Sequence, residues 1–156
     1  MTDSENTGDN MPIMHPNIVA SPEEASEGKQ KIDWVRRNMP ILRQLESEFQ
    51  KQQPFAGKRV LVCVHLEAKT AYLALVLAAG GATVAVTGSN PDSTKDDVVA
   101  ALDSLGLHVY ARHGATLDEM EGYMSLALDI RPHVVIDDGG DIVELLHRSR
   151  SELAET

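Results

Sequence analysis

The sequence predicts an α/β fold in which an open parallel sheet of about four strands is flanked by helices. From residue 59 onward, runs of apolar and β-branched residues alternate with segments of helical periodicity. Each run is almost continuously apolar, which is typical of strands buried on both faces of a parallel sheet. Glycines separate the segments, as they do at turns. Because parallel strands are joined by right-handed crossovers, this alternation indicates a three-layer, Rossmann-like or flavodoxin-like arrangement.

The chain divides into a tail and one domain. Residues 1–28 are rich in Asp, Glu, Ser, Asn, Gly and Pro and lack periodicity, so we expect a disordered tail there. A helix should precede the sheet, because apolar residues recur at helical spacing between Pro40 and Phe49. The length of 156 residues fits one domain, which we place at residues 29–156.

The elements that follow alternate between strand and helix, and each has a local reason. Residues 59–66 form an almost unbroken apolar run, and the helix after it ends at Gly80, a suitable C-cap. Thr116 and Glu119 have the spacing of a capping box, which begins a helix that stops before Pro132. The predicted order is strand 59–66, helix 68–79, strand 83–88, helix 93–106, strand 108–111, helix 116–131, strand 133–136 and helix 142–153.

Charge and cysteine content argue against several classes of function. The formal net charge of -10 and the isoelectric point near 4.9 argue against a nucleic-acid-binding surface, which would be basic. They argue equally against docking on anionic membranes. Cys63 is the one cysteine, and its place in an apolar strand indicates a buried, inert thiol. Since neither a membrane-spanning apolar run nor a basic leader occurs, we expect a soluble, cytoplasmic protein.

Polar side chains collect where the predicted strands end. The carboxyl ends of parallel strands share one edge, and open α/β sheets bind ligands there. The residues at this edge are His65, Glu67, Lys69 and Thr70 after the first strand, Ser89, Asn90, Ser93 and Thr94 after the second, and Asp137, Asp138 and Asp141 after the fourth. Because adjacent ionised carboxylates repel each other, the pair Asp137-Asp138 needs a proton, a cation or a hydrogen-bond donor. The sequence thus predicts a polar crevice assembled from three loops.

Each of these residues also has a purely structural interpretation. Asp is common at a helix N-cap, and Asp-Gly is common in turns. His65 can be a hydrogen-bonded core histidine, and Glu67 with Lys69 can form the solvated start of a helix. Ser93 and Thr94 precede an acidic pair at capping-box spacing, so we expect one of them to cap the following helix whatever else it does.

Three chemistries can be compared for the crevice. A dinucleotide site requires a G-x-G-x-x-G turn after a strand, which is absent, so this chain should not hold NAD by itself. A metal site made of His65 and the two aspartates lacks a metal-ligand spacing such as H-E-x-x-H. A phospho-acceptor domain would carry its acidic pair after the first strand, whereas here the pair follows the fourth. The residues therefore favour none of these three sites.

Several short motifs occur in one register between residue 29 and about residue 147. They are Trp34 with Met39-Pro40-Ile41-Leu42, His65-Leu66-Glu67-Ala68-Lys69-Thr70-Ala71, Gly80-Gly81-Ala82, Ser89-Asn90-Pro91 with Ser93-Thr94 and Asp96-Asp97, and Ile136-Asp137-Asp138-Gly139-Gly140-Asp141 with His147. Together they resemble the N-terminal substrate-binding part of adenosylhomocysteinase (S-adenosylhomocysteine hydrolase).

The resemblance implies a reaction and a role for each matched residue. The family cleaves S-adenosylhomocysteine to adenosine and homocysteine, using tightly held NAD to oxidise the ribose 3′-hydroxyl and so acidify the 4′ proton. Homocysteine is then eliminated, water adds, and the ketone is reduced again. His65 and Asp138 match the general acid/base pair near the 4′ and 5′ positions. The other matched residues are Glu67, Lys69 and Thr70 beside the adenine and Ser93 on a loop lining the same pocket.

The sequence stops at Thr156, before the point where the family has an E-E-T-T-T-G segment that supplies a ribose-binding Glu and threonines touching NAD. The family's Lys and Asp for 3′-oxidation and its NAD-binding domain are missing as well. We therefore expect an incomplete substrate-binding domain that holds no NAD and is inactive alone. Turnover of S-adenosylhomocysteine by the purified chain with NAD would contradict this expectation.

Three interpretations stay open on the sequence, and the small-molecule partner that we expect is an adenosine-type ligand. The first is a truncated or split hydrolase that needs a missing C-terminal half. The second is a nucleoside-binding or regulatory module that associates with a full-length homologue. The third is a fragment without function.

Lys69 bears on which nucleoside would bind. It stands where many family members carry a Glu that can accept a hydrogen bond from the adenine 6-amino group. An ammonium group only donates, so Lys69 suits a 6-oxo purine better, and we expect inosyl ligands to compete with adenosyl ones. Asp92 and Lys95 are further departures, since the family usually has Leu and Gln at these positions.

Overall fold

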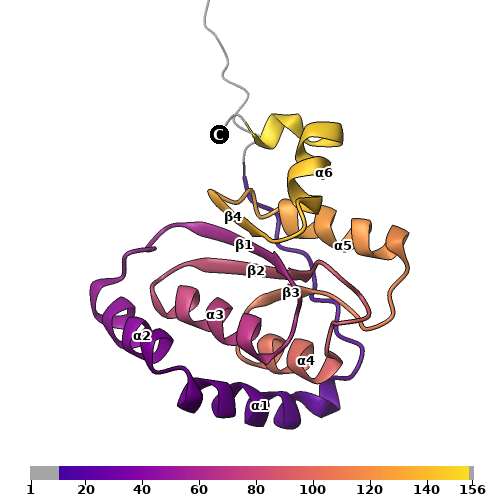
Figure 1. The fold of residues 1–156 in the computed structure, drawn as a ribbon. Helices are drawn as coiled ribbons and strands as arrows, with labels where there is room; N and C mark the ends of the chain where they lie inside the picture. Colours follow the sequence, from indigo (N-terminus) through magenta and orange to yellow (C-terminus); the bar gives the residue numbers. More distant parts are fainter. Residues whose placement is uncertain (1–10, 155–156) are drawn as a thin grey trace, which may run out of the picture.

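The computed structural model describes residues 11–154 and has a four-stranded parallel sheet at its centre (Figure 1). Its strands are β1 (Arg59–Val64), β2 (Thr83–Gly88), β3 (His108–Tyr110) and β4 (Val134–Asp137), in the order β3-β2-β1-β4. The predicted α/β fold with an open parallel sheet is confirmed. Because the chain steps from β1 outward to β3 and then returns to the other side of β1, the switch point of the topology lies between β1 and β4.

Helices cover both faces of the sheet. They are α1 (Ala25–Asn38), α2 (Pro40–Gln52), α3 (Ala68–Ala79), α4 (Asp96–Ser104), α5 (Leu117–Leu128) and α6 (Asp141–Ser149), with the short 3-10 helices η2 (Pro22–Glu24) and η3 (Ser151–Leu153). Helices α3 and α4 lie on one face and α5 and α6 on the other (Figure 1). Within residues 11–154, none of the helices is long and apolar enough to cross a membrane.

Alternate residues of β1 contribute to two separate cores. Val60 and Val62 pack in the cluster that includes α1, α3 and α4, whereas Leu61 and Cys63 pack in the cluster of α5 and α6. This follows from the two-residue period of a strand, which sends successive side chains to opposite faces. The Cys63 thiol is fully buried, as predicted, and its burial raises its pKa, so it stays protonated at neutral pH.

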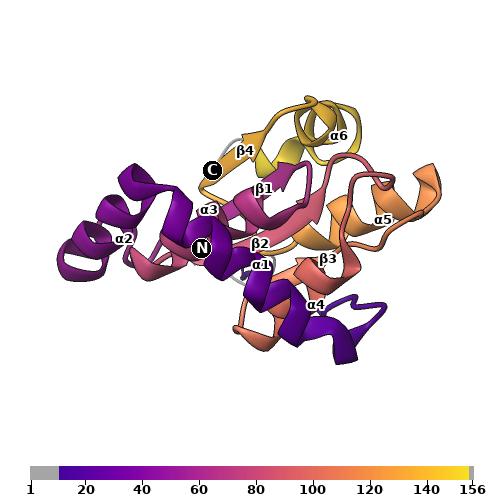
Figure 2. The same cartoon turned by 60° about the horizontal axis from the view of Figure 1, so that its bottom comes forward.

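One face of the sheet carries a second helical layer that the sequence did not predict. Helix α1 packs across α3 and α4 on the side away from the sheet, and α2 packs beside α3 (Figure 2). Only α2, which begins at Pro40, corresponds to the single predicted helix. Gly28 allows the close approach of α1, because a Cβ atom at this position would overlap the carbonyl oxygen of Asp97 in α4.

The segment predicted to be a disordered tail differs from that expectation over its described part. Residues 1–10 of the predicted tail lie outside the described residues, but residues 13–18 bond to the end of α5 and to β3, and α1 already begins at Ala25. The amide of Ile18 donates to the carbonyl of Val109 at 2.9 Å, and Ile18 forms a parallel bridge with Tyr110. This pairing covers the outer edge of β3, a tertiary contact that composition does not reveal.

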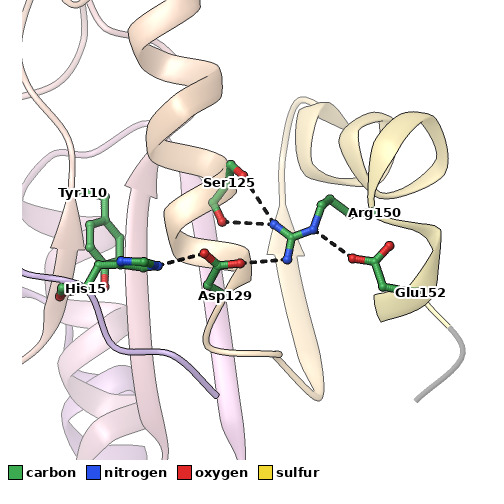
Figure 3. A network of polar contacts seen from close by, with 6 residues as sticks. All are labelled: His15, Tyr110, Ser125, Asp129, Arg150 and Glu152. Atoms are coloured by element: carbon green, nitrogen blue, oxygen red, sulfur yellow. Dashed lines mark hydrogen bonds and ion pairs between the residues drawn. The ribbon is translucent and has the colours of Figure 1, made fainter. Parts of the chain in front are cut away.

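Asp129, which follows the last residue of α5, connects the two ends of the described chain (Figure 3). Its Oδ2 lies 2.8 Å from His15 Nε2, and its Oδ1 accepts a hydrogen bond from Arg150 Nη2 at 2.7 Å. Arg150 also donates to Ser125 and, through Nε, to Glu152 at 3.0 Å. We call His15, Asp129 and Arg150 the clasp. It holds the segment before α1 and the segment after α6 against the same helix end.

Candidate functional site

The predicted crevice forms at the carboxyl ends of β1, β2 and β4, with His65 at its centre. Strand β1 ends at Val64 rather than at the predicted residue 66, so His65 lies in the loop beyond the sheet. His65 Nδ1 lies 2.7 Å from Ser93 Oγ, and the Ser93 hydroxyl donates to the carbonyl of Asn90 at 3.0 Å. Since a hydroxyl has one proton to donate, Ser93 accepts from Nδ1–H, and a neutral ring then keeps its lone pair on Nε2.

The two adjacent aspartates have separate functions in the structure. The Asp137 carboxylate accepts hydrogen bonds from the amides of Gly140, Ile142 and Val143 at 3.0, 2.9 and 3.2 Å, and so caps the start of α6. These amides are the donors that an adjacent acidic pair requires. Asp137 therefore acts as a helix cap, which is the structural interpretation given for an aspartate at this position. The Asp138 carboxylate does not take part in this cap and can interact with His65.

Asp138 faces His65 across the switch point between β1 and β4. Its Oδ2 lies 4.0 Å from His65 Nε2 and 3.5 Å from the His65 backbone nitrogen. Both side chains are open to solvent. Nearby, partial burial raises the pKa of Asp141, and the negative charges of Asp137, Glu144 and Asp138 raise it further.

Thr70 and the Ser93–Thr94 turn fix the position of His65. The Thr70 hydroxyl is buried and donates to the carbonyl of His65 at 2.7 Å. The Thr94 hydroxyl donates to the carbonyl of Asn90, as does that of Ser93. The predicted capping of α4 by Ser93 or Thr94 is wrong, because the helix begins at Asp96 after Lys95 and has no side-chain cap. Both hydroxyls instead bind the turn that presents Ser93 to His65.

A groove of about 860 Å³ opens beside the crevice, between α1 and the first turns of α3 and α4. The predicted residues Glu67 and Lys69 line it, with Lys69 Nζ 3.9 Å from Glu67 Oε1. The other lining residues are Glu27, Gln30, Lys31, Trp34 and Val35 of α1, Ala68 of α3, and Lys95 and Val98 at the start of α4. The sequence did not predict the groove because it did not predict α1. The signal available in the sequence was the i, i+3 spacing of Ile32 and Val35, which are buried in α1, beside Trp34.

The described residues offer little to a metal or a dinucleotide. Within residues 11–154, no group of three or more His, Cys, Asp or Glu side chains is placed to hold a metal ion. The turn between β1 and α3 contains no glycine, and the carboxylate of Glu67 precedes the first turn of α3. A pyrophosphate needs close backbone approach and a positive helix end at this point. These residues therefore do not fit NAD.

The fold and the crevice define a doubly wound α/β domain with a histidine and an aspartate at its switch point. A family model described as S-adenosyl-L-homocysteine hydrolase matches residues 17–156, and the chain belongs to this family. The resemblance seen in the sequence is thereby confirmed.

Curated relatives of two kinds are similar to the chain. It is 52% identical over 131 residues to an adenosylhomocysteinase of Pyrococcus abyssi, covering 84% of this chain and 31% of the relative. It is 46% identical over 129 residues to an S-inosyl-L-homocysteine hydrolase of Methanocaldococcus jannaschii, covering 83% and 31%. An adenosylhomocysteinase of Thermotoga maritima is 49% identical over 131 residues, covering 82% and 32%. The chain thus spans about a third of the length of these relatives, in their N-terminal part.

Proposed function

We propose that this chain binds a purine nucleoside thioether, of the kind named for its relatives, and supplies the acid/base groups for its cleavage. The observation that carries the proposal is the meeting of His65 and Asp138 across the switch point, with 4.0 Å between Nε2 and Oδ2. A ligand atom lying beside this pair, at about 3 Å from each, would be within reach of both groups. The family match and the relatives' names support the choice of substrate.

In this proposal, His65 Nε2 removes the 4′ proton of the nucleoside, and the thioether sulfur leaves from the 5′ carbon. The imidazolium that forms is stabilised by the Asp138 carboxylate and returns its proton to the departing sulfur. Ser93 and Thr70 hold the ring and the backbone of His65 and are positioning residues. The 4′ proton becomes acidic only when the 3′ position is oxidised. In this proposal, His65, Asp138, Ser93 and Thr70 do not perform that oxidation.

Glu67 and Lys69 belong to the side of the site that receives the base. They lie in the same loop-to-helix segment as His65 but face the groove rather than the crevice. A nucleoside with its ribose at His65 would therefore extend its base toward these two side chains. S-adenosyl and S-inosyl ligands share the ribose and the thioether and differ only in this base.

Proton exchange on a nucleoside already oxidised at the 3′ position tests the acid/base role without NAD. The purified chain should accelerate replacement of the 4′ proton by deuterium in D₂O, followed by NMR. His65→Asn and Asp138→Asn should each slow this exchange about 100-fold or more, because each removes a group that takes or stabilises the proton. Lys51→Gln, an exposed change on α2, should leave the rate unchanged.

The same assay contains the outcomes that would overturn the proposal. Exchange no faster than in buffer would remove the acid/base function from this chain. Exchange that is catalysed but insensitive to both substitutions would assign the chemistry to other residues.

We also propose, as a second candidate, a nucleoside-binding module that associates with a longer relative. Its support is β4, whose outer edge pairs with no strand within residues 11–154 and whose Val134 is 49% exposed. An open edge strand is a template for pairing with another chain. Native mass spectrometry of the chain mixed with a full-length adenosylhomocysteinase should then detect a mixed complex, and homomeric masses alone would exclude this candidate.

A further inference from the structure

The groove beside the crevice has the size and position to hold a purine base. Its volume of about 860 Å³ lies within the range of small-molecule sites. A backbone hydrogen bond joins the groove to the crevice. The amide of Lys95, which lines the groove, donates to the carbonyl of Leu66, one residue after His65, at 3.1 Å. Trp34 offers an exposed indole on the opposite wall, on which a planar base can stack.

Three lysines line this groove in a chain of net charge -10, and they differ in their partners. Lys31 Nζ is held 2.6 Å from Asp97 Oδ2, a nearly buried carboxylate that raises the pKa of the lysine. Lys69 has only the long 3.9 Å contact with Glu67. Among the described residues, the side chain of Lys95 has no hydrogen bond or ion pair. Lys69 and Lys95 are thus the two ammonium groups available to a ligand.

We propose that Lys95 acts with Lys69 to select a 6-oxo purine over a 6-amino purine, with the base stacked on Trp34. The inference rests on the proposed function, which places a nucleoside at His65. A 6-oxo purine presents two adjacent acceptors, O6 and N7, whereas a 6-amino purine replaces O6 by an amino donor. Ammonium groups only donate. The N1–H of a 6-oxo purine can donate a hydrogen bond to the Glu67 carboxylate, which lines the same groove.

Calorimetric titration of the 156-residue chain with inosine and with adenosine tests this assignment. Inosine should bind about tenfold or more tightly than adenosine, as expected for one well-formed donor pair on the base edge. Lys95→Gln and Lys69→Glu should each reduce this ratio, and Trp34→Ala should weaken both nucleosides alike. Lys51→Gln is the matched control that should keep the ratio, and far-UV circular dichroism checks that each variant is folded.

The outcomes separate this inference from the proposed function. Equal or tighter binding of adenosine would overturn the selection of a 6-oxo purine, as would a ratio that survives both lysine substitutions. If in that case His65→Asn still weakens both nucleosides, the proposed function stands without the inference. If neither nucleoside binds, the proposed function fails as well.

Discussion

Within residues 11–154, two histidine–aspartate pairs place the same two side chains in different surroundings. In the clasp, His15 Nε2 lies 2.8 Å from Asp129, whose second oxygen is taken by Arg150. In the crevice, 4.0 Å separates His65 Nε2 from Asp138. The histidine and aspartate side chains are 30% and 23% exposed in the clasp but 54% and 36% exposed in the crevice.

The two pairs thus differ in how tightly their side chains are held and in how far they are exposed to solvent. Both oxygens of the Asp129 carboxylate have a partner in the clasp, so the clasp holds the two ends of the described chain together. In the crevice, Ser93 binds Nδ1 of His65 and Thr70 binds its backbone carbonyl, whereas Nε2, which faces Asp138, is open to solvent. Unneutralised groups of this kind are typical of functional sites and lower stability there.

The largest expected effect on stability comes from breaking the clasp. Asp129→Ala should lower the free energy of unfolding by about 2–3 kcal/mol, because it removes two charge-assisted hydrogen bonds and leaves Arg150 without this carboxylate. Urea denaturation measures the loss. Asp138→Ala is the matched control and should change stability by no more than about 0.5 kcal/mol. If Asp129→Ala and Asp138→Ala lowered the free energy of unfolding by the same amount, the clasp would be no more important for stability than the crevice pair.

A smaller effect should separate the two adjacent aspartates. Asp137→Ala should cost about 1–2 kcal/mol, because three amides at the start of α6 lose their acceptor. Asp138→Asn should instead lose the deuterium exchange described above and keep its stability. An Asp137→Ala variant as stable as the unchanged chain would show that the cap contributes nothing.

The smallest effect concerns pH and the charge of Asp141. Its pKa is raised in the folded state, so the folded protein binds the proton more tightly than the unfolded chain does. The resulting stabilisation is present below the ordinary pKa of 3.8 and is lost as the pH rises through the higher folded value. Asp141→Asn should therefore make the protein slightly more stable at pH 7 and flatten the dependence of stability on pH in this range.

The control for this prediction has the opposite sign. Asp118→Asn neutralises a carboxylate in the first turn of α5, where negative charge is favourable, and should slightly destabilise the protein at pH 7. Urea unfolding of both variants at pH 7 and at pH 3 measures the two changes. Destabilisation by Asp141→Asn at pH 7 would show that the charge of Asp141 is compensated in the crevice.

Elements with strong local signals were predicted closely. Helix α3 and strand β2 have the predicted bounds, and the capping box of Thr116 and Glu119 forms as expected. These signals are local, since each depends on neighbouring residues alone. The last helix was predicted as continuous to residue 153 but ends at Ser149, where the chain turns so that Arg150 reaches Asp129.

The features that the sequence did not predict depend on contacts between distant residues. Helix α1 buries only Gly28, Ile32 and Val35, so its composition resembles that of a polar tail. The groove was not predicted either, because residues of α1 form one of its walls. The crevice was predicted from the ends of three strands, but the sequence could not distinguish Asp137 from Asp138, because only the path of α6 decides which carboxylate meets the amides.

Gly28 has a consequence for the groove that reaches beyond its own contact. It brings α1 against α4, and these two helices carry Trp34 and Lys95 on opposite walls of the groove. The distance between the walls is therefore determined at a residue that does not line the groove. A methyl group added at position 28 would overlap the Asp97 carbonyl and force α1 or α4 to shift, although no residue that lines the groove would have changed. Specificity in such a fold can change through the spacing of two helices.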